Sequence, residues 1–495
     1  MPDYIYNPTI AFSLVNSSLT IEDVIREEER ENIRYGQDNL VTLVYKEQML
    51  SFQASDFFSI PDQQVQEEVT LNMQMNSFQQ DFSQTITLDV GEGVRLDSMA
   101  LKDGTLLFNA AAQQLQAEGF DLDVEVSLPQ SRDEQGIPLS FWVLAGEPEE
   151  VDLGGYTFEL SSGQNIHNQL QIDYKVVVSG NGTAQQNSYQ VQLESNFLDL
   201  EFDKVYGYLG NHVMDLGSQL ILLDIFSVLQ DGSIELAQPS VTLRAINSIG
   251  IPIDLSVNPF VAVKQGVGYD ITGMSDPVHI NSPTADYLLE RVNTQEHLTV
   301  DNSNIAQVLT RFPEEIIYGL SLEVNPDGNE PNFAFDSSQL DVELEVALPL
   351  DGRLSGITLK DTFDIDLQQE VEEIQWVELN LEVHNGFPLD ARVQVQLLDV
   401  NNLLIMNLFE DQAEENIVTA GQIDEQGRVT APGISNITLM LDKNQVQQLL
   451  NTSRIVLVSR LNTANDGTSM VKILSDNEIN IRLGARVNVQ STVSF

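Results

Sequence analysis

The chain has 495 residues, 42% of them hydrophobic, which is enough for a buried core and for about three or four domains of ordinary size. Its 75 acidic and 23 basic side chains give a formal net charge of −52, a field that argues against nucleic acid and anionic lipid headgroups as partners. It has no cysteine, which excludes disulfides and thiolate chemistry, and no apolar run reaches the ~18–20 residues of a transmembrane helix.

The chain opens with a predicted strand, helix and strand, which we assign to an N-terminal region over residues 1–68. Thr9 to Val15 is mostly apolar and predicts the first strand. Thr20-Ile21-Glu22-Asp23 fits a capping box, so we expect a charged helix from there to about Asn32. Asn39 to Lys46 is rich in Val and Leu and predicts the next strand.

From about residue 69 onward, alternating apolar and polar residues dominate the sequence. Strict alternation indicates a strand with one buried face and one solvent-exposed face, which is typical of antiparallel sandwiches. Two short helices are expected, at Ile305 to Arg311 and at Asp442 to Leu450. The pattern predicts a mainly β protein of tandem antiparallel β-sandwich-like domains with a few short helices. We place these domains at 69–205, 206–335 and 336–495.

Repeated phrases support a modular chain. Gly250-Ile-Pro-Ile-Asp254 and Gly386-Phe-Pro-Leu-Asp390 each follow an alternating strand that ends near an Asn, and Gly136-Ile-Pro-Leu-Ser140 is a weaker echo. We assign these phrases a structural role, because Pro stops ladder pairing and Gly allows a turn. The segments 101–106 and 229–234 share a central Asp-Gly, which predicts a tight turn between two strands.

No catalytic or cofactor motif appears in the sequence. The five histidines are scattered singly, without the paired spacing of a metal site, and the glycine patterns of nucleotide and serine-nucleophile sites are absent. Calcium prefers hard oxygen ligands from loops, and Asp327 and Asn329 alternate as such ligands do. The same Asn-Pro-Asp-Gly run also fits an ordinary turn. We therefore predict no cofactor and name Asp327 and Asn329 as candidate calcium ligands.

The charge is distributed unevenly along the chain. Leu441 to Phe495 holds four acids and six bases, so this tail is slightly basic. We expect its bases to pair with acidic neighbours in the fold, and a basic face for an acidic partner is the alternative. Leu220 to Phe226 is apolar beyond strict alternation, which favours a fully buried central strand over a ligand-binding face.

Several phrases resemble those of large β-rich envelope lipoproteins of the Bacteroidota. They are Asn7 to Leu14 with Leu19 to Asp23, Asp152-Leu-Gly-Gly-Tyr156, Asn247 to Pro252, and Leu461-Asn-Thr463 with Ile479 to Arg486. The resemblance implies export, a lipidated cysteine just before the present start and residence at the outer membrane, although the missing cysteine departs from that pattern. The strand–Asn–Pro–strand units also resemble the small sandwich domains of late-embryogenesis-abundant proteins.

The start of the chain bears on its location. Met1-Pro2-Asp3-Tyr4 lacks the basic-then-apolar pattern of a secretory signal. We interpret it as a start placed after a removed leader, and the start of a cytoplasmic protein is the alternative. We therefore expect the protein in the periplasm or on the cell surface, associated with the outer membrane and holding a lipid anchor ahead of Met1.

Three functions from different classes are consistent with these features. The preferred one is a non-enzymatic outer-membrane-associated envelope protein, which acts as a scaffold or accessory subunit of a membrane protein complex and binds a protein partner there. A component of the type 9 secretion translocon is a specific variant of it. The alternatives are a module that binds a lipid or another apolar ligand between its sheets, and a hydrolase that uses a pair of carboxylates.

Overall fold

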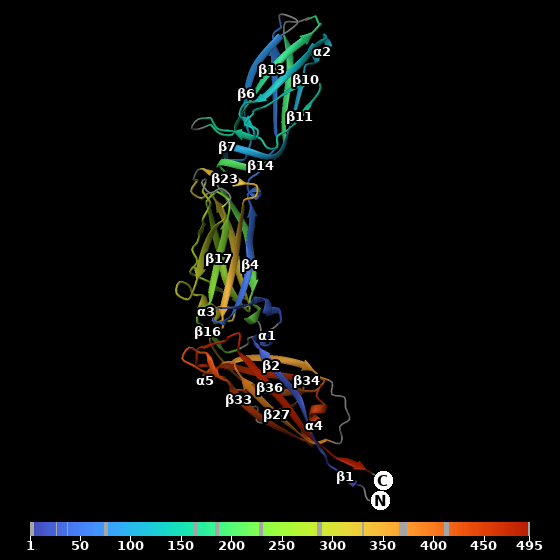
Figure 1. Ribbon diagram of the computed structural model, residues 1–495, viewed down its shortest axis with the longest axis vertical. Helices are drawn as coiled ribbons and strands as arrows, with labels where there is room; N and C mark the ends of the chain where they lie inside the picture. Colours follow the sequence, from blue (N-terminus) through green and yellow to red (C-terminus); the bar gives the residue numbers. More distant parts are fainter. Residues whose placement is uncertain are drawn as a thin grey trace.

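The computed structural model is a long rod of three β-sheet bodies placed end to end (Figure 1). We call them the tip body, the central body and the terminal body, the last because both chain ends lie there. The accessible surface is 25824 Å², roughly 1.4 times the ~18,000 Å² expected of a compact protein of this mass. The structure describes residues 4–25, 27–36, 38–73, 78–162, 166–183, 188–226, 231–284, 290–328, 331–365, 374–409 and 415–493.

The terminal body is a sandwich of a four-stranded and a five-stranded antiparallel sheet. The first sheet has the order β2 (Thr9–Thr20), β36 (Glu478–Val489), β27 (Ile374–Asn385) and β33 (Gly433–Asp442). The second has β26 (Ile357–Asp364), β34 (Arg454–Thr463), β28 (Leu389–Leu398) and β29 (Leu404–Asn407), with β30 (Glu415–Val418) on β28. Smaller pairs are β31 (Gln422–Ile423) with β32 (Val429–Ala431), and β1 (Tyr4–Tyr6) with β37 (Ser491–Val493).

The central body is a sandwich of two five-stranded sheets. One has β15 (His212–Leu222), β22 (Glu315–Val324), β18 (Ile253–Lys264) and β19 (Val267–Asp270), with β20 (Val278–Ile280) on β18. The other has β21 (Val292–Leu298), β17 (Ser240–Asn247), β24 (Gln339–Pro349), β4 (Val41–Gln53) and β3 (Ile33–Tyr35). Below it, β16 (Ser233–Leu236), β25 (Asp351–Ser355) and β35 (Val471–Lys472) form a small sheet at the border with the terminal body.

The tip body combines a four-stranded sheet with a seven-stranded one. The first has β10 (Leu139–Leu144), β8 (Phe120–Leu128), β13 (Gln169–Gly180) and β6 (Phe78–Thr87). The second has β23 (Asn332–Phe335), β14 (Tyr189–Tyr208), β7 (Arg95–Ala111), β12 (Thr157–Glu159) and β9 (Ser131–Arg132), with β11 (Glu149–Asp152) on β7 and β5 (Gln63–Leu71) on β14. Inward side chains such as Leu122, Val124 and Val176 are fully buried, as the alternating pattern requires.

These sheets confirm the mainly β, antiparallel prediction. They join segments that are far apart in the chain, because the chain runs up the rod to the tip and returns to its starting end. Both β2 and β4 come from the predicted N-terminal region 1–68, yet β2 pairs with β36 in the terminal body and β4 pairs with β24 in the central body. The division into four segments stays a prediction.

Helical segments are few and short. They are α1 (Ile21–Val24), α2 (Gln113–Ala117), α3 (Ile305–Leu309), α4 (Lys443–Leu450) and α5 (Ala464–Gly467), with 3₁₀ turns η1 (Glu27–Asn32), η2 (Ala54–Asp56) and η3 (Asp224–Phe226). The capping box predicted at Thr20 exists, since the Thr20 amide donates to Asp23 over 2.9 Å. The structure shows a second one at the start of α4, where the Gln445 amide donates to Asp442 over 2.9 Å. The predicted single helix from Thr20 to Asn32 is wrong, because Ile25 is extended at φ −76° and ψ 143°.

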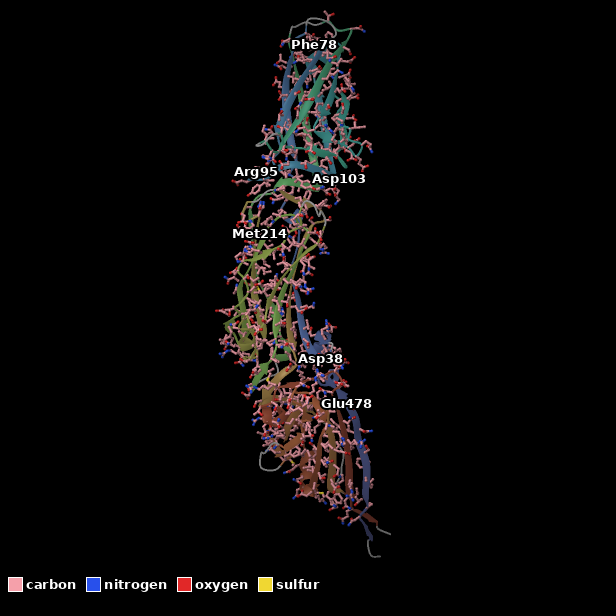
Figure 2. The ribbon with its side chains drawn as sticks, turned by 60° about the vertical axis from the view of Figure 1, so that its left-hand side comes forward. Asp38, Phe78, Arg95, Asp103, Met214 and Glu478 are labelled. Atoms are coloured by element: carbon pink, nitrogen blue, oxygen red, sulfur yellow. The ribbon has the colours of Figure 1, made fainter. Side chains whose placement is uncertain are left out.

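Two further expectations are corrected by the strands. The Asp103-Gly104 pair does not form a hairpin turn, because β7 continues through it and pairs with β14 across an irregular register. Asp103 instead lies where the tip body meets the central body (Figure 2), at a change of strand direction that Gly104 allows with φ 151°. Leu220 and Leu222 are about half exposed on the edge strand β15, so their segment is not a buried central strand.

The repeated Gly-apolar-Pro-apolar-Asp phrases are corners that carry the chain from one sheet of a sandwich to the other. The first joins β17 to β18 in the central body and the second joins β27 to β28 in the terminal body. Each corner begins at a fully buried Asn whose side-chain oxygen accepts from the amide two residues later, Ile249 for Asn247 at 2.8 Å and Phe387 for Asn385 at 2.9 Å. The structural role predicted for the phrase is confirmed.

The Asn side-chain nitrogen holds the rest of each corner. In Asn247 it donates to the carbonyls of Ile249 and Asn281, over 3.2 and 3.1 Å. In Asn385 it donates to the carbonyls of Leu389 and Thr419, over 2.8 and 2.9 Å. The buried amide thus satisfies backbone groups that no ladder reaches.

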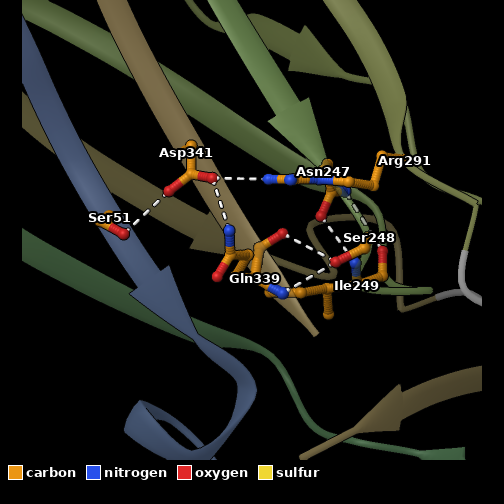
Figure 3. Close-up of polar contacts among 7 residues, drawn as sticks. All are labelled: Ser51, Asn247, Ser248, Ile249, Arg291, Gln339 and Asp341. Carbon is orange, nitrogen blue, oxygen red and sulfur yellow. Dashed lines mark hydrogen bonds and ion pairs between the residues drawn. The ribbon is translucent and has the colours of Figure 1, made fainter. Parts of the chain in front are cut away.

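The first corner is also tied to the neighbouring strands (Figure 3). Ser248 Oγ donates to the Gln339 carbonyl over 3.1 Å and accepts from the Gln339 amide over 2.9 Å. Asp341, two residues further on β24, accepts from Ser51 and from Arg291, each over 2.8 Å. These contacts connect β17, β24 and β4 at the end of the central body.

Candidate functional site

A hollow of about 610 Å³ lies on the outer face of the four-stranded sheet in the terminal body. Each of the four strands of this sheet contributes two outward-facing residues to the lining of the hollow. These residues are Ser13 and Asn16 from β2, Arg482 and Gly484 from β36, Asn380 and Glu382 from β27, and Asn436 and Thr438 from β33. We call this set the sheet-face groove.

Strand register arranges the sheet-face groove as two parallel rows across the sheet. One row runs Asn436, Glu382, Arg482, Asn16, and the other runs Thr438, Asn380, Gly484, Ser13. The row between them is Ile437, Leu381, Leu483, Val15, whose side chains take the opposite face by alternation. The backbone of that middle row is therefore the floor of the hollow.

Gly484 and a bulge in β2 give the groove its depth. Gly484 stands between Asn380 and Ser13, so its row has no side chain at that position. A methyl group added there would meet nothing closer than 3.7 Å, the Phe12 carbonyl oxygen. The register of β2 shifts between Ser13 and Val15, which displaces the edge strand beside the glycine. Glycine inside a strand often marks a close approach by another group.

Hydrogen bonds hold the polar groups of this face in fixed positions. Asn380 donates to Glu378 Oε1 over 2.8 Å and accepts from Thr438 Oγ1 over 2.9 Å. Arg486 also donates to Glu378 Oε1, over 3.2 Å. The Asn380 amide, and after it Arg486, hold the pKa of the Glu378 carboxyl below its usual value.

The row that runs from Asn436 to Asn16 carries the two opposite charges of the groove, Glu382 and Arg482. Glu382 contacts His384 Nε2 at 2.8 Å and Arg482 at 3.7 Å. The hydrogen bond with His384 lowers the pKa of the Glu382 carboxyl, and Arg482 lowers it further. The negative charge of Glu382 is therefore matched by the positive charge of Arg482 within the groove.

The side-chain composition of the sheet-face groove differs from that of other solvent-exposed sheet faces in the same chain. The outward side chains of β8 include Asp121, Asp123 and Glu125, and those of β24 include Asp341, Glu343 and Glu345. The sheet-face groove has one carboxylate among its eight outward residues, and the others are amides, hydroxyls, an Arg and a Gly. Sequence reasoning missed the groove, although Gly484 inside a strand and the amides at wet positions were visible signals.

Asp327, one of the two candidate calcium ligands, does not line this groove. Asp327 is exposed, and Asn329 lies outside the described residues. The neighbouring Asn325 is buried and donates from its amide to Asn332 Oδ1 over 2.9 Å. Within the described ranges, no group of three or more His, Asp or Glu side chains is placed to hold a metal ion. The calcium assignment stays a prediction.

The five histidines have separate hydrogen-bond partners. His167, His279 and His384 contact Asp97, Asp254 and Glu382 at 2.8, 2.6 and 2.8 Å. His297 contacts Thr242 Oγ1 at 2.8 Å, and His212 contacts the Leu209 carbonyl at 3.1 Å. No two share a partner in these contacts, in agreement with their scattered spacing.

The expected pairing of the C-terminal tail's bases with acids is found for Arg454, Lys472, Arg482 and Arg486. Arg454 contacts Asp364 at 2.8 Å, Lys472 contacts Asp351 at 3.4 Å, and Arg486 contacts Glu378 at 3.2 Å. All these side chains lie in the terminal body or at its border. The tail therefore does not present a bare basic face at these positions.

Carboxylates also meet in a second hollow, of about 350 Å³, between the tip and central bodies. Glu201 and Asp336 both line it, and the ammonium of Lys102 contacts them at 3.9 and 2.9 Å. One ammonium group therefore contacts both carboxylates, and the hydrolase alternative stays a prediction.

Among the described residues, no helix combines the length and hydropathy that crossing a membrane requires.

Comparisons with known proteins give weak likenesses. No family model and no curated protein matches the chain. One similar structure is a crystal structure from Parabacteroides distasonis ATCC 8503, a member of the Bacteroidota, of a protein provisionally described as secreted. The TM-score is 0.26 and the sequence identity is 10%, and the match covers 97% of this chain and 99% of that one. The infectious bursal disease virus Gx strain structure has a TM-score of 0.15 and 7% identity, over 90% and 85% of the two chains. The structure of bacteriophage PM2 has a TM-score of 0.12 and 7% identity, and the match covers 86% of this chain and 100% of that one. At these scores the likenesses carry no inference about function.

Proposed function

We propose that the protein is a non-enzymatic scaffold of the cell envelope, a rod that is attached at its terminal body and presents its tip body to a protein partner in an outer-membrane complex. The observation that carries this proposal is the position of both chain ends at one end of a three-body rod (Figure 1). β1 pairs with β37 in the register Tyr4 to Val493, so any group joined to either terminus would leave the rod there.

A scaffold of this kind must keep its bodies at a fixed spacing, and backbone hydrogen bonds cross both borders. Between the tip and central bodies, Gly250 and Phe333 exchange amide–carbonyl bonds of 3.0 and 3.2 Å, and β23 also pairs with β14. Lys102 and Asp336 add an ion pair at 2.9 Å. This border is therefore a continuation of the sheets and not a free linker.

The border between the central and terminal bodies is built in the same way. The Val41 amide donates to the Ile473 carbonyl over 3.0 Å, and the Ile473 amide donates to the Leu350 carbonyl over 2.9 Å. Arg428 and Asp38 form an ion pair at 3.2 Å across it. These contacts join the start, middle and end of the sequence at one level of the rod.

The tip body carries the surface that suits a protein partner. Trp142 is 50% exposed on the edge strand β10, with Lys175 Nζ 5.2 Å from its ring centroid. Leu144, on the same outward side of β10, is 42% exposed. Exposed Trp is enriched among residues that dominate binding energy at interfaces, so this patch favours contact with another protein.

The test combines location with contact. The full-length gene product is expressed in its own organism with a photo-crosslinker beside Trp142, and envelope membranes are isolated. We expect one recurrent partner from a membrane complex, and its loss in Trp142→Ala. Val213→Ala is the matched control, because Val213 is 71% exposed on the central body. Recovery of a free monomer only, or crosslinks unaffected by Trp142→Ala, would contradict the proposal.

A further inference from the structure

We infer that the sheet-face groove of the terminal body binds a neutral oligosaccharide. This inference goes beyond the scaffold proposal and does not depend on it, because it rests on the groove alone. It begins from the eight outward residues of two cross-strand rows around a hollow of about 610 Å³, a volume within the usual range of ligand pockets.

The groove offers the hydrogen-bonding groups that a sugar requires. Each sugar hydroxyl is both a donor and an acceptor, so vicinal hydroxyls are matched by side chains that also do both. Asn16, Asn380 and Asn436 each present an amide oxygen and an amide nitrogen, and Ser13 and Thr438 present hydroxyls. Glu382 and Arg482 add an acceptor pair and a donor fork beside them.

These groups are held in place before any ligand arrives. Asn380 is fixed between Glu378 and Thr438, and Glu382 between His384 and Arg482. Restraint of this kind reduces the side-chain entropy that binding would otherwise cost. Because no aromatic residue is among the lining residues, there is no ring against which a sugar would stack. We therefore expect millimolar affinity.

Other ligand classes fit the groove less well. A polyanion is disfavoured by the net charge of −52. A basic peptide would need free carboxylates, but Glu382 and Glu378 already accept from His384 and Arg486. A peptide strand cannot pair with the floor, because the backbone groups there are engaged in the β2, β36, β27 and β33 ladders. A lipid tail would meet amides and hydroxyls, which lose hydrogen bonds to water when covered.

Gly484 allows a substitution that fills the groove without disturbing the fold. Its backbone is not in the left-handed region, and a Cβ there has space around it. Gly484→Val adds a β-branched side chain, which suits a strand, directly over the floor between Asn380 and Ser13. The matched control is Gln192→Val, which adds the same side chain at an exposed position of β14 in the tip body.

The experiment uses the full chain with a glycan microarray, followed by saturation-transfer NMR with neutral hexasaccharides of glucose, mannose, galactose and N-acetylglucosamine. We expect at least one neutral glycan to bind, Gly484→Val and Asn380→Ala each to weaken binding at least tenfold, and Gln192→Val to leave it unchanged. Thermal melts confirm that each variant is folded, and Asn380→Ala carries the test if Gly484→Val does not fold. Absence of binding to any neutral glycan, or binding that both groove variants retain, overturns the inference.

Discussion

Replacing Gly250 by Ala should destabilise the central body, although the same change usually stabilises a strand. Gly250 has an ordinary negative-φ or extended backbone, so Ala is not strained there, and the loss of unfolded-chain freedom alone would add about 0.4–1 kcal/mol of stability. However, the added Cβ would overlap three atoms of the Phe333 ring. Phe333 is 2% exposed, so its ring has no free space to enter.

The magnitude follows from these two opposing effects. Overpacking of a well-packed site costs about 1–3 kcal/mol, and the entropy gain offsets part of it. We expect Gly250→Ala to lower the free energy of unfolding of the central body by about 1–2 kcal/mol. Each kcal/mol lowers the melting temperature by about 2–4 °C. Gly484→Ala is the matched control, because the space beside Gly484 is open and the substitution should be neutral or stabilising.

The assay is urea unfolding followed by two signals. Trp142 lies in the tip body and Trp376 in the terminal body, and the chain has no other Trp. Tryptophan fluorescence therefore reports the outer bodies, while far-UV circular dichroism includes the central body. Phe333→Leu should rescue Gly250→Ala in a double-mutant cycle, since a smaller side chain frees the space. An unfolding midpoint of Gly250→Ala at or above that of the wild type would refute the steric argument.

Four further expectations can be checked on the same protein. Asn247→Ala and Asn385→Ala should each lower the free energy of unfolding by at least about 2 kcal/mol in urea titrations, because each leaves buried backbone groups unpaired; a loss at one corner only would show that the two are not equivalent. Burial raises the pKa of Tyr174 and of Tyr318 from 10.0 to about 12, so both favour the neutral ring in the folded state and contribute stability that is present below pH ~10 and lost as pH rises to ~12. Tyr174 and Tyr318 should accordingly ionise late in an absorbance titration, and Tyr174→Phe should flatten the alkaline loss of stability; a single transition near pH 10 would be inconsistent with this. The melting temperature should rise between ~10 and ~500 mM sodium chloride, because screening relieves the repulsion of a chain at −52, and a flat or falling curve would speak against it. Small-angle X-ray scattering should give a radius of gyration well above the ~23 Å of a compact chain of this length, and a value near ~23 Å would rule out the rod.

The sequence predicts the local structure well where the local pattern decides it. Alternation identifies the strands around Leu122 to Leu128 and Leu340 to Val346, and the short helix expected from Asp442 to Leu450 is present as α4. It fails where packing decides. Asp103-Gly104 has the composition of a turn, but pairing of β7 with β14 on both sides keeps the strand continuous.

Pairing between distant strands could not be predicted, and the candidate site depends on it. Alternation sets which face of a strand is buried, but it does not say which strand lies beside it. Asn16 and Arg482 are neighbours only because β2 pairs with β36, at opposite ends of the sequence. Asn436 and Glu382 then join them through β33 and β27. No spacing in the sequence brings these four residues together, so the groove becomes visible only in the folded sheet.

The pairing of β2 with β36 also fixes the order in which the molecule is completed during synthesis. Domains usually fold as they leave the ribosome, starting from the N-terminus, but Thr9–Thr20 has to wait until Glu478–Val489 has been made. The first long strand of the chain is therefore among the last to find its partner, after the tip and central bodies have all their strands. A chain that ends before Glu478 leaves Ile10, Phe12 and Val15 without the ladder that holds them. Truncation at the C-terminal end of the sequence therefore removes the partner of a strand at the N-terminal end.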